Sequence, residues 1–342
     1  KKPDLRMLLQ ATKTVGKLLK PKDLVIFEST VFPGTTEDIC IPILEKKSKL
    51  KLFDKSKKFD NNFFWCGYSP ERINPSDRSH LLPKTNKLVS GSNHEVSYFL
   101  KKLYRKIIHA SVITTPNIKV AEASKILENV QRDLNIALMN EVSKIYNKLG
   151  INTLDVINAA GTKWNFEKFY PGLVGGHCIG VDPYYMAHKA KKLKAKCQLI
   201  LGGRKINDEM PKYIARKFSE KIKKLPTKEK KKILIMGVTF KENCPDIRNS
   251  KVVDLYKVLK KDKKLIIDLY DPIANENDFK KLYKLKLIKN LDPNQYDGVI
   301  IAVRHRIFKN IGFKKIKTFL KNKFVLFDLK SLFTKNKKSF NL

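Results

Sequence analysis

Short apolar runs alternate with amphipathic stretches along the first third of the chain. The runs that read as strands cover residues 23–29, 62–69, 87–92 and 111–116. The stretches that read as helices cover residues 35–48, with Thr35 or Thr36 near the cap, and 93–107. Strands and helices that alternate in this way indicate an α/β architecture with a largely parallel sheet.

The pattern changes between residues 117 and 150, a segment with no proline and no internal glycine. A helix of about 30 residues would be about 45 Å long, which suits a connector between two domains or the core of a dimer. Ile126, Val130, Leu134 and Leu138 recur along it and predict a core-facing stripe. Further helices are predicted at residues 152–160, 183–194 and 198–223.

A second alternation of strands and helices begins at residue 231. Its predicted strands cover residues 231–238, 264–272, 296–305 and 323–331. Its predicted helices cover residues 250–261 and 313–321. We therefore expect an α/β domain over residues 1–116, a helical middle domain over 117–224 and a second α/β domain over 225–342.

The chain carries 71 Lys+Arg against 33 Asp+Glu, a formal net charge of +38. Such a charge suggests a nucleic acid or an anionic membrane as partner. Only 10 of these basic residues are arginine, however, and the lysines are spread along the whole chain. Because arginine is the usual reader of phosphates and base edges, nucleic-acid binding is the less favoured alternative. No run of 18 apolar residues is present, which predicts no membrane-spanning helix.

Five cysteines are present, at positions 40, 66, 178, 197 and 244. An odd number without any C-x-x-C motif suggests neither a disulfide framework nor a zinc site. We therefore expect no metal, and a reducing, cytoplasmic location for the protein.

One of these cysteines, Cys178, lies in the most unusual segment of the chain, PGLVGGHCIGVDPYY. The glycines of this segment are Gly172, Gly175, Gly176 and Gly180. Glycine permits tight turns and the close approach of a ligand. The segment is either a tight structural turn or the site of a nucleophilic cysteine near a carboxylate, Asp182. His177, beside the cysteine, could lower the pKa of the thiol.

Polar residues also recur on the long predicted helix and after predicted strands. Lys125 and Asn129 are four residues apart and hence on one face, which is either solvated or part of a buried site. Glu71 in SPERINPSD and Thr30 in ESTVFPG each follow a predicted strand. The carboxyl ends of strands in an open α/β sheet bind ligands, although turn chemistry alone could explain both residues.

The loop VTFKENCPDIRNS likewise follows a predicted strand and holds Lys241, Asp246 and Arg248. Its lysine and arginine would suit phosphate groups. Cys244 in the same loop has no base nearby in the sequence and is interpreted as structural.

Six segments of the chain resemble, in the same order, the UDP-glucose/UDP-mannuronate dehydrogenase family. They are ESTVFPGTTE, GYSPERINP, EASKILENVQRDLNIALMNE, GTKWNFEKFYPGLVGGHCIGVDPYY, GRKINDEM and GVTFKENCPDIRNSKVVD. The resemblance covers nearly the whole chain. The residues of the fourth segment are similar to the UDP-N-acetylhexosamine 6-dehydrogenase branch of the family.

The resemblance implies a Rossmann-like NAD-binding domain, a helical middle domain that carries the catalytic cysteine, and a C-terminal Rossmann-like UDP-binding domain. It implies an NAD-dependent, four-electron oxidation of the C6 alcohol of a UDP-N-acetylhexosamine to the uronic acid, for surface-polysaccharide synthesis. The GlcNAc, GalNAc and ManNAc epimers all stay open as substrates. The implied partners are this sugar nucleotide and a second copy of the chain, joined through the long helix, with no nucleic acid and no membrane.

The resemblance also implies roles for particular residues. Cys178 matches the nucleophile that forms a thiohemiacetal and then a thioester, and Asp182 matches an acidic partner in proton transfer. Lys125 matches the lysine that stabilises the oxyanion, with Asn129 as its companion. The residues that match positions around the hydrolytic water are Glu71 and Thr30.

The other matching positions concern binding. The matches to substrate-binding positions are Arg204, Lys241, Gly175 and Gly176. The matches to positions near the cofactor are Thr30, Glu71, Cys178 and Arg248.

The chain departs from the family in two places. The family reads leucine-proline-phenylalanine-arginine where this chain has Glu167, Lys168, Phe169 and Tyr170, which leaves the sugar preference open. The G-x-G-x-x-G turn that holds the NAD pyrophosphate occurs nowhere in a strand-to-helix context. We therefore expect an incomplete N-terminal domain in a truncated chain. The alternative function is an inactive fragment that retains only UDP-sugar binding and dimerisation.

Overall fold

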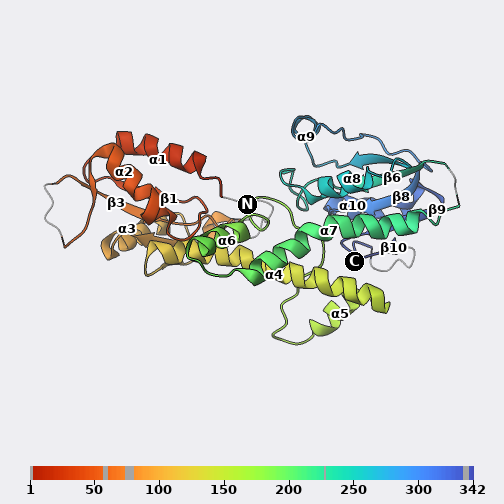
Figure 1. The fold of residues 1–342 in the computed structure, drawn as a ribbon, viewed down its shortest axis with the longest axis horizontal. Helices are drawn as coiled ribbons and strands as arrows, with labels where there is room; N and C mark the ends of the chain where they lie inside the picture. Colours follow the sequence, from red (N-terminus) through yellow and green to blue (C-terminus); the bar gives the residue numbers. More distant parts are fainter. Residues whose placement is uncertain (1–2, 57–60, 74–80, 227–228, 334–338) are drawn as a thin grey trace. The chain divides into compact units, whose positions relative to one another are not determined.

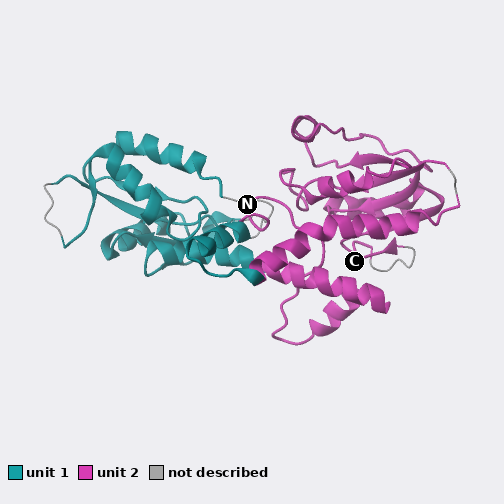
Figure 2. Cartoon of the chain, in the orientation of Figure 1, with its two compact units in different colours: residues 1–131, 182–198 teal, residues 132–181, 199–342 magenta. Residues whose placement is uncertain are grey.

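The computed structural model of the protein describes residues 3–56, 61–73, 81–226, 229–333 and 339–342. The chain forms two compact units, of which the first comprises residues 1–131 and 182–198 and the second residues 132–181 and 199–342 (Figure 2). The long helix α4 (Ile118–Leu149), labelled in Figure 1, contributes residues to both units. None of the helices in the described ranges combines the length and the apolar character needed to cross a membrane.

Unit 1 is built on a five-stranded sheet in the order β1-β3-β4-β5, with β2 paired to β3. Its strands are β1 (Leu24–Phe27), β2 (Lys51–Leu52), β3 (Phe63–Tyr68), β4 (Lys87–Gly91) and β5 (Val112–Thr114). All the pairs are parallel except that of β3 with β4. Side chains alternate between the two faces of a strand. Phe64 and Cys66 therefore enter one apolar cluster, and Trp65 packs against another.

Helices supply the other side of each cluster in unit 1. They are α1 (Arg6–Leu18), a π-helical turn (Thr36–Cys40) that continues as α2 (Ile41–Ser48), a 3-10 turn (Leu82–Lys84), α3 (His94–Arg105) and α6 (Asp182–Lys192). Leu44 of α2 packs with Phe64. Leu100 of α3 packs with Val89 of β4. Helix α3 begins at Asn93, whose side chain accepts a hydrogen bond from the Val96 N–H.

Unit 2 contains a five-stranded, fully parallel sheet in the order β10-β9-β8-β6-β7. Its strands are β6 (Lys231–Met236), β7 (Leu265–Tyr270), β8 (Tyr296–Ile301), β9 (Leu320–Asp328) and β10 (Ser339–Phe340). Its helices besides α4 are α5 (Thr153–Ala160), α7 (Gln198–Ile222), α8 (Lys251–Leu259), α9 (Glu276–Tyr283) and α10 (Arg306–Thr318). Ile233 of β6 packs in the cluster that contains α7 and α8 residues, whereas Leu234 packs with Phe308 of α10. The two faces of this sheet are therefore both covered.

The predicted alternation of strands and helices is confirmed in both units, and so is the long helix α4. The helix predicted at 313–321 corresponds to the second part of α10 (Arg306–Thr318). Gly312, with a φ of +78° and a ψ of 158°, is not helical and kinks α10 just before this part. The strand predicted at 323–331 begins earlier, at Leu320, where it pairs with Tyr296. The sequence predicts neither α1 nor α9. The predicted domain boundaries after residues 116 and 224 stay a prediction.

The prediction of a core-facing stripe on α4 is wrong for one of its residues, Leu138. Ile126 and Val130 are buried, but Leu138 is 51% exposed. A helix turns by about 100° per residue, so a strict spacing of four residues rotates by about 40° at each step. Leu138 therefore lies about 120° around the helix from Ile126, away from the core.

Candidate active site

The polar face of α4 in unit 1 is buried, not solvated. Lys125 is a buried residue, and Asn129 is half-buried one turn further along. The Asn129 side chain donates a hydrogen bond from Nδ2 to Oδ2 of Asp182 at 2.6 Å. Asp182 is the first residue of α6 and is itself buried. Three residues that the sequence singles out separately thus form one cluster, since the charge of Lys125 also acts on Asp182.

The carboxyl group of Asp182 titrates close to neutral pH. Burial raises its pKa to about 6, although the hydrogen bond from Asn129 and the charge of Lys125 favour the ionised form. A carboxyl group with such a pKa exists in both protonation states near pH 6, so it can accept and return a proton. A perturbed pKa of this kind is typical of residues in active sites.

The turn that carries Thr30 is attached to the same helix by a residue that the sequence does not identify. Glu122 of α4 is fully buried, and its carboxylate accepts hydrogen bonds from the Gly34 N–H at 2.5 Å and the Thr36 N–H at 2.9 Å. Burial raises the pKa of Glu122, while the two backbone donors oppose that shift. Thr35 is the N-cap residue, in agreement with the prediction, but its side chain makes no cap hydrogen bond, and the Glu122 carboxylate accepts from the Thr36 N–H instead. A glutamate three residues before Lys125 gives no sign in the sequence that it is buried.

Glu71 lies on an exposed turn after β3, and its carboxylate accepts a hydrogen bond from the Ile73 N–H at 2.6 Å. The neighbouring Arg72 forms an ion pair with Glu128 of α4 at 2.8 Å. Buried Lys87 donates to the backbone carbonyl of Pro70 at 3.2 Å. The Arg72–Glu128 pair therefore links the turn to the helix residue just before Asn129. Residues 74–77 of the predicted polar segment lie outside the described residues.

In unit 2 the glycine-rich segment forms a tight turn that leaves the Cys178 side chain exposed. Gly176 has a φ of +85°, and a Cβ atom there would lie 2.7 Å from the ring of Phe240. A Cβ atom on Gly175 would lie 2.6 Å from the backbone oxygen of Asn249. Only glycine permits this close packing against the loop after β6. The two interpretations of the segment are therefore compatible, because the tight turn is what presents the thiol.

His177 does not supply a positive charge to the neighbouring thiol. Burial, together with the nearby charge of Arg248, lowers the pKa of His177 below its usual value. The imidazole is therefore neutral near pH 7. A neutral His177 offers no positive charge that would lower the pKa of the Cys178 thiol, so the structure does not support that prediction.

Arg204 is enclosed within unit 2. Its side chain is 1% exposed, and its guanidinium donates to Asp133 of α4 and, at 2.7 Å, to Asp208 of α7. Asn207 of α7 also donates to Asp133, at 2.7 Å. This placement favours a role in joining two helices over direct contact with a substrate.

The remaining candidates lie on the loop after β6. Lys241 is half-buried, and its backbone carbonyl accepts a hydrogen bond from the Thr239 hydroxyl at 2.9 Å. Arg248 is exposed and pairs with Asp246 at 2.7 Å. The loop contacts the glycine turn through the Gly176 N–H, which donates to the Asn249 carbonyl. The structure thus groups Gly175, Gly176 and the Arg248 loop in unit 2, and Thr30, Lys125, Asn129 and Asp182 in unit 1.

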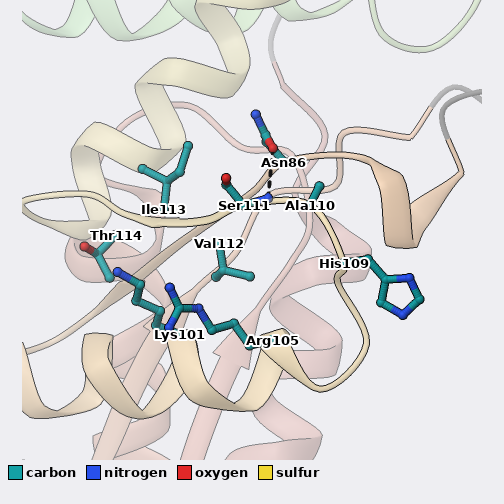
Figure 3. Close-up of a pocket in the computed structure, with 9 residues that line it drawn as sticks. All are labelled: Asn86, Lys101, Arg105, His109, Ala110, Ser111, Val112, Ile113 and Thr114. Atoms are coloured by element: carbon teal, nitrogen blue, oxygen red, sulfur yellow. Dashed lines mark hydrogen bonds between the residues drawn. The ribbon is translucent and has the colours of Figure 1, made fainter.

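The candidate residues are not those that line the cavity beside strand β5. That cavity, of about 590 Å³, runs between α3 and the edge of the unit 1 sheet (Figure 3). Its basic lining residues are Lys101, Arg105 and His109. Within the described ranges, no three histidine, cysteine or acidic residues are placed to hold a metal ion.

Comparison with known proteins identifies the chain through all three of its parts. The NAD binding, central and UDP binding domains of the UDP-glucose/GDP-mannose dehydrogenase family match residues 1–108, 119–209 and 234–335. The chain belongs to this family. The predicted resemblance and the predicted order of NAD-binding, helical and UDP-binding domains are thereby confirmed.

The relatives agree with this assignment. A UDP-N-acetyl-D-glucosamine 6-dehydrogenase of Pseudomonas aeruginosa is 46% identical over 100% of this chain and 79% of its own length. An enzyme of the same name from Salmonella typhi is 45% identical over 96% of this chain and 76% of its own length. The solved structure of a UDP-D-ManNAc dehydrogenase from Pyrococcus horikoshii superimposes with a TM-score of 0.85 at 27% identity, covering 99% of this chain and 77% of that one. The chain spans 76% to 79% of the length of these three proteins.

NAD is the cofactor that the first domain of the family binds. Thr30 and Glu71 follow the carboxyl ends of β1 and β3, where open α/β sheets bind their ligands. The turn after β1 does not fit its pyrophosphate, because the N–H groups of Gly34 and Thr36 already donate to the Glu122 carboxylate.

Proposed function

We propose that the protein oxidises the C6 alcohol of a UDP-N-acetylhexosamine to the uronic acid, and that UDP-N-acetylglucosamine is its preferred substrate. The two UDP-N-acetyl-D-glucosamine 6-dehydrogenases are 45% and 46% identical to this chain, whereas the UDP-D-ManNAc dehydrogenase is 27% identical. The observation that carries the proposal is the buried cluster of Lys125, Asn129 and Asp182. A cation, an amide and a carboxyl group with a pKa of about 6 suit proton transfer beside an oxyanion.

NAD⁺, when bound, accepts a hydride in each of two oxidation steps. The Cys178 sulfur adds to the aldehyde carbon after the first step and holds the sugar as a thiohemiacetal. After the second step the sugar is a thioester of Cys178, and water releases the acid and the free thiol. The exposed position of Cys178 on its glycine turn supports this role.

The buried cluster on α4 and α6 would handle charge and protons. The Lys125 ammonium stabilises negative charge on the reacting oxygen. Asp182, four residues after Cys178 in the chain, accepts a proton through water, and Asn129 holds its carboxyl group in place. Thr30 and Glu71 are proposed to position the hydrolytic water and the reactive end of the cofactor.

The UDP part of the substrate is assigned to residues of unit 2. Lys241 supplies a cation to the phosphates. Gly175 and Gly176 would contribute to substrate binding by keeping their turn packed against the loop that carries Lys241. Arg248, on the same loop as Lys241, is proposed to lie near the cofactor. We do not assign Arg204 to the substrate, since both of its terminal nitrogens are bonded to carboxylates.

A homodimer through α4 is part of the proposal. Leu138, Ile145 and Leu149 are 51%, 51% and 65% exposed. Their spacing of seven and four residues keeps them within about 40° of one another on the helix. An exposed apolar stripe on a long helix suits the same stripe of a second copy. The five free cysteines suit a reducing cytoplasm.

The decisive experiment measures the stoichiometry of the reaction. Purified protein with limiting UDP-N-acetylglucosamine and excess NAD⁺ should form two NADH per sugar, followed at 340 nm, and UDP-N-acetylmannosamine should react more slowly. Cys178→Ser should form no uronic acid, with Cys197→Ser as the matched control that keeps it. Binding of the sugar nucleotide without NADH formation would favour the alternative function, an inactive protein that binds UDP-sugars. Acid formation by Cys178→Ser would exclude this residue as the nucleophile.

A further inference from the structure

One buried cation of unit 1 has no part in the proposed mechanism. Of the lysines that the structure describes, three are buried, namely Lys87, Lys125 and Lys231. Lys125 belongs to the cluster with Asp182, and Lys231 donates to two backbone carbonyls around the end of α7. Burial of an ammonium group is costly unless the group is paired and hydrogen-bonded. Lys87, the first residue of β4, therefore needs an explanation of its own.

The Lys87 ammonium lies at the carboxyl ends of β1 and β3. It donates to Oε1 of Glu28 at 3.2 Å, to the carbonyl of Ser69 at 3.5 Å and to the carbonyl of Pro70 at 3.2 Å. Glu28 follows β1, and Ser69 and Pro70 follow β3. An ammonium group has three donors, which these three acceptors satisfy. Two of the acceptors belong to the residues directly before Glu71.

The direction of β4 is what brings Lys87 to this end of the sheet. Strand β4 pairs antiparallel with β3, in a register that sets Tyr68 opposite Ser90. In an antiparallel pair each step forward on one strand is a step backward on the other. Three more steps therefore lead to Glu71 on one side and Lys87 on the other. A strand parallel to β3 would begin at the other end of the sheet, away from the turn that carries Glu71.

A tyrosine of α3 completes the surroundings of the ammonium. The Tyr104 hydroxyl donates to Oε1 of Glu28 at 2.6 Å, the same atom that Lys87 contacts. The ammonium also lies 5.1 Å from the centre of the Tyr104 ring, within the range of a cation–π contact. Burial raises the pKa of Tyr104, and the negative charges of Glu28 and Glu71 raise it further. The Glu71 carboxylate is thus near enough to act on this cluster.

We propose that Lys87 is a positioning residue, which holds the turn after β3 so that the Glu71 carboxylate is placed for the hydrolytic water. The inference rests on the proposed role of Glu71 in release of the uronic acid. The turn itself is exposed, and the Glu71 carboxylate accepts from the Ile73 N–H of the same turn. A buried cation bonded to two carbonyls of the turn gives it a fixed point inside unit 1.

Loss of Lys87 should therefore slow one step of the reaction more than the others. In that step water adds to the thioester carbonyl, the carbon–sulfur bond breaks, and the acid and the Cys178 thiol form. The two hydride transfers to NAD⁺ precede it and form no bond to this water. A residue that only stabilised the fold would instead lower all steps together, in proportion to the folded fraction.

The test is a rapid-mixing experiment with saturating UDP-N-acetylglucosamine and NAD⁺, in which NADH absorbance is followed. Lys87→Met should form the first two NADH per enzyme within about twofold of the wild-type rate, and then turn over about tenfold more slowly. The sugar thioester on Cys178 should accumulate, as measured by intact mass after an acid quench. Lys87→Arg keeps a cation with several donors and should recover part of the rate. The matched control is Lys84→Met, at an exposed position, which should behave as the wild type does.

Amide hydrogen exchange of the free enzyme gives a readout that does not depend on the reaction. Residues 69–73 should exchange faster in Lys87→Met than in the wild type, because the turn loses its fixed point. The Lys84→Met control should exchange as the wild type does. If circular dichroism shows that Lys87→Met is misfolded, Lys87→Gln, which keeps a donor group, replaces it in both measurements.

Several outcomes would overturn the proposal. An equal loss of both kinetic phases would show a general loss of folded enzyme, and unchanged hydrolysis in Lys87→Met would show that the turn needs no such support. Glu71→Gln should also hydrolyse the thioester slowly. If it hydrolyses as the wild type does while Lys87→Met is slow, Lys87 does not act through Glu71. If the wild type forms no NADH, the proposed function fails, and hydrogen exchange alone decides whether Lys87 holds the turn.

Discussion

Asn129 donates a hydrogen bond of 2.6 Å to the carboxylate of Asp182, although the two residues are far apart in the chain. One lies in the middle of α4, and the other begins α6. The bond favours the ionised carboxylate and so opposes the burial that raises the pKa of Asp182 to about 6. Asn129 thereby limits the rise of the Asp182 pKa that burial causes.

Replacement of this amide should move the acidic limb of the pH–activity profile. Asn129→Ala removes a hydrogen bond that lowers the pKa of Asp182, so the pKa should rise by about one unit. If ionised Asp182 is the active form, activity is lost as the pH falls through this pKa. The limb of kcat/KM should therefore move from about pH 6 in the wild type toward pH 7 in the variant. Gln131→Ala, an exposed residue of the same helix, should leave the limb in place. A limb that stays fixed in Asn129→Ala would mean that another group titrates.

Removal of the Glu122 carboxylate should both destabilise the protein and impair the Thr30 turn. Glu122→Ala leaves the N–H groups of Gly34 and Thr36 without their acceptor, at a cost of about 2–4 kcal/mol of unfolding free energy. Urea denaturation measures this loss, and initial rates of NADH formation should show a lower kcat. Glu141→Ala, at an exposed position of α4, is the control and should change the unfolding free energy by less than about 0.5 kcal/mol. A variant as stable and active as the control would refute the role of Glu122.

An alanine should be tolerated at a glycine of α7 but not at a glycine of the turn before Cys178. Gly176→Ala forces a side chain into the left-handed region and within 2.7 Å of Phe240, which should cost about 2–3 kcal/mol or displace the turn. Product formation should fall, because Cys178 follows two residues later. Gly202→Ala, which meets no atom within 4 Å in the middle of a helix, should be neutral or stabilising by up to about 1 kcal/mol. Thermal melting and product assays of both variants check this contrast.

Arg204 allows a direct test between a structural and a binding role. Arg204→Met leaves Asp133 as a buried carboxylate without its cation, which should reduce stability by about 3–5 kcal/mol. The double variant Arg204→Met/Asp133→Leu removes both charges and should recover part of that loss. If the recovered protein shows an unchanged KM for the sugar nucleotide, Arg204 joins helices. A KM raised tenfold in a stable double variant would instead indicate contact with the substrate.

The alternation of strands and helices, the length of α4 and the motifs around Cys178 are local patterns, and for that reason the sequence predicts them well. The period of apolar residues follows from the geometry of a single helix or strand. Even so, the prediction that the buried stripe on α4 extends to Leu138 is wrong, because residues spaced four apart rotate gradually around a helix with 3.6 residues per turn. The sequence also left open whether Lys125 and Asn129 face solvent.

The burial of a side chain and its hydrogen-bond partners are decided only when distant segments of the chain pack together. By itself the sequence determined the α/β architecture, the family and the glycine turn at Cys178. Tertiary structure decided that Asp182 is desolvated beside Asn129, that Glu122 accepts two backbone hydrogen bonds, and that Arg204 lies between two carboxylates. It also buried Lys87 against the turn that carries Glu71. The physical reason is that desolvation and pairing energies depend on neighbours from other elements, which no local pattern of residues contains.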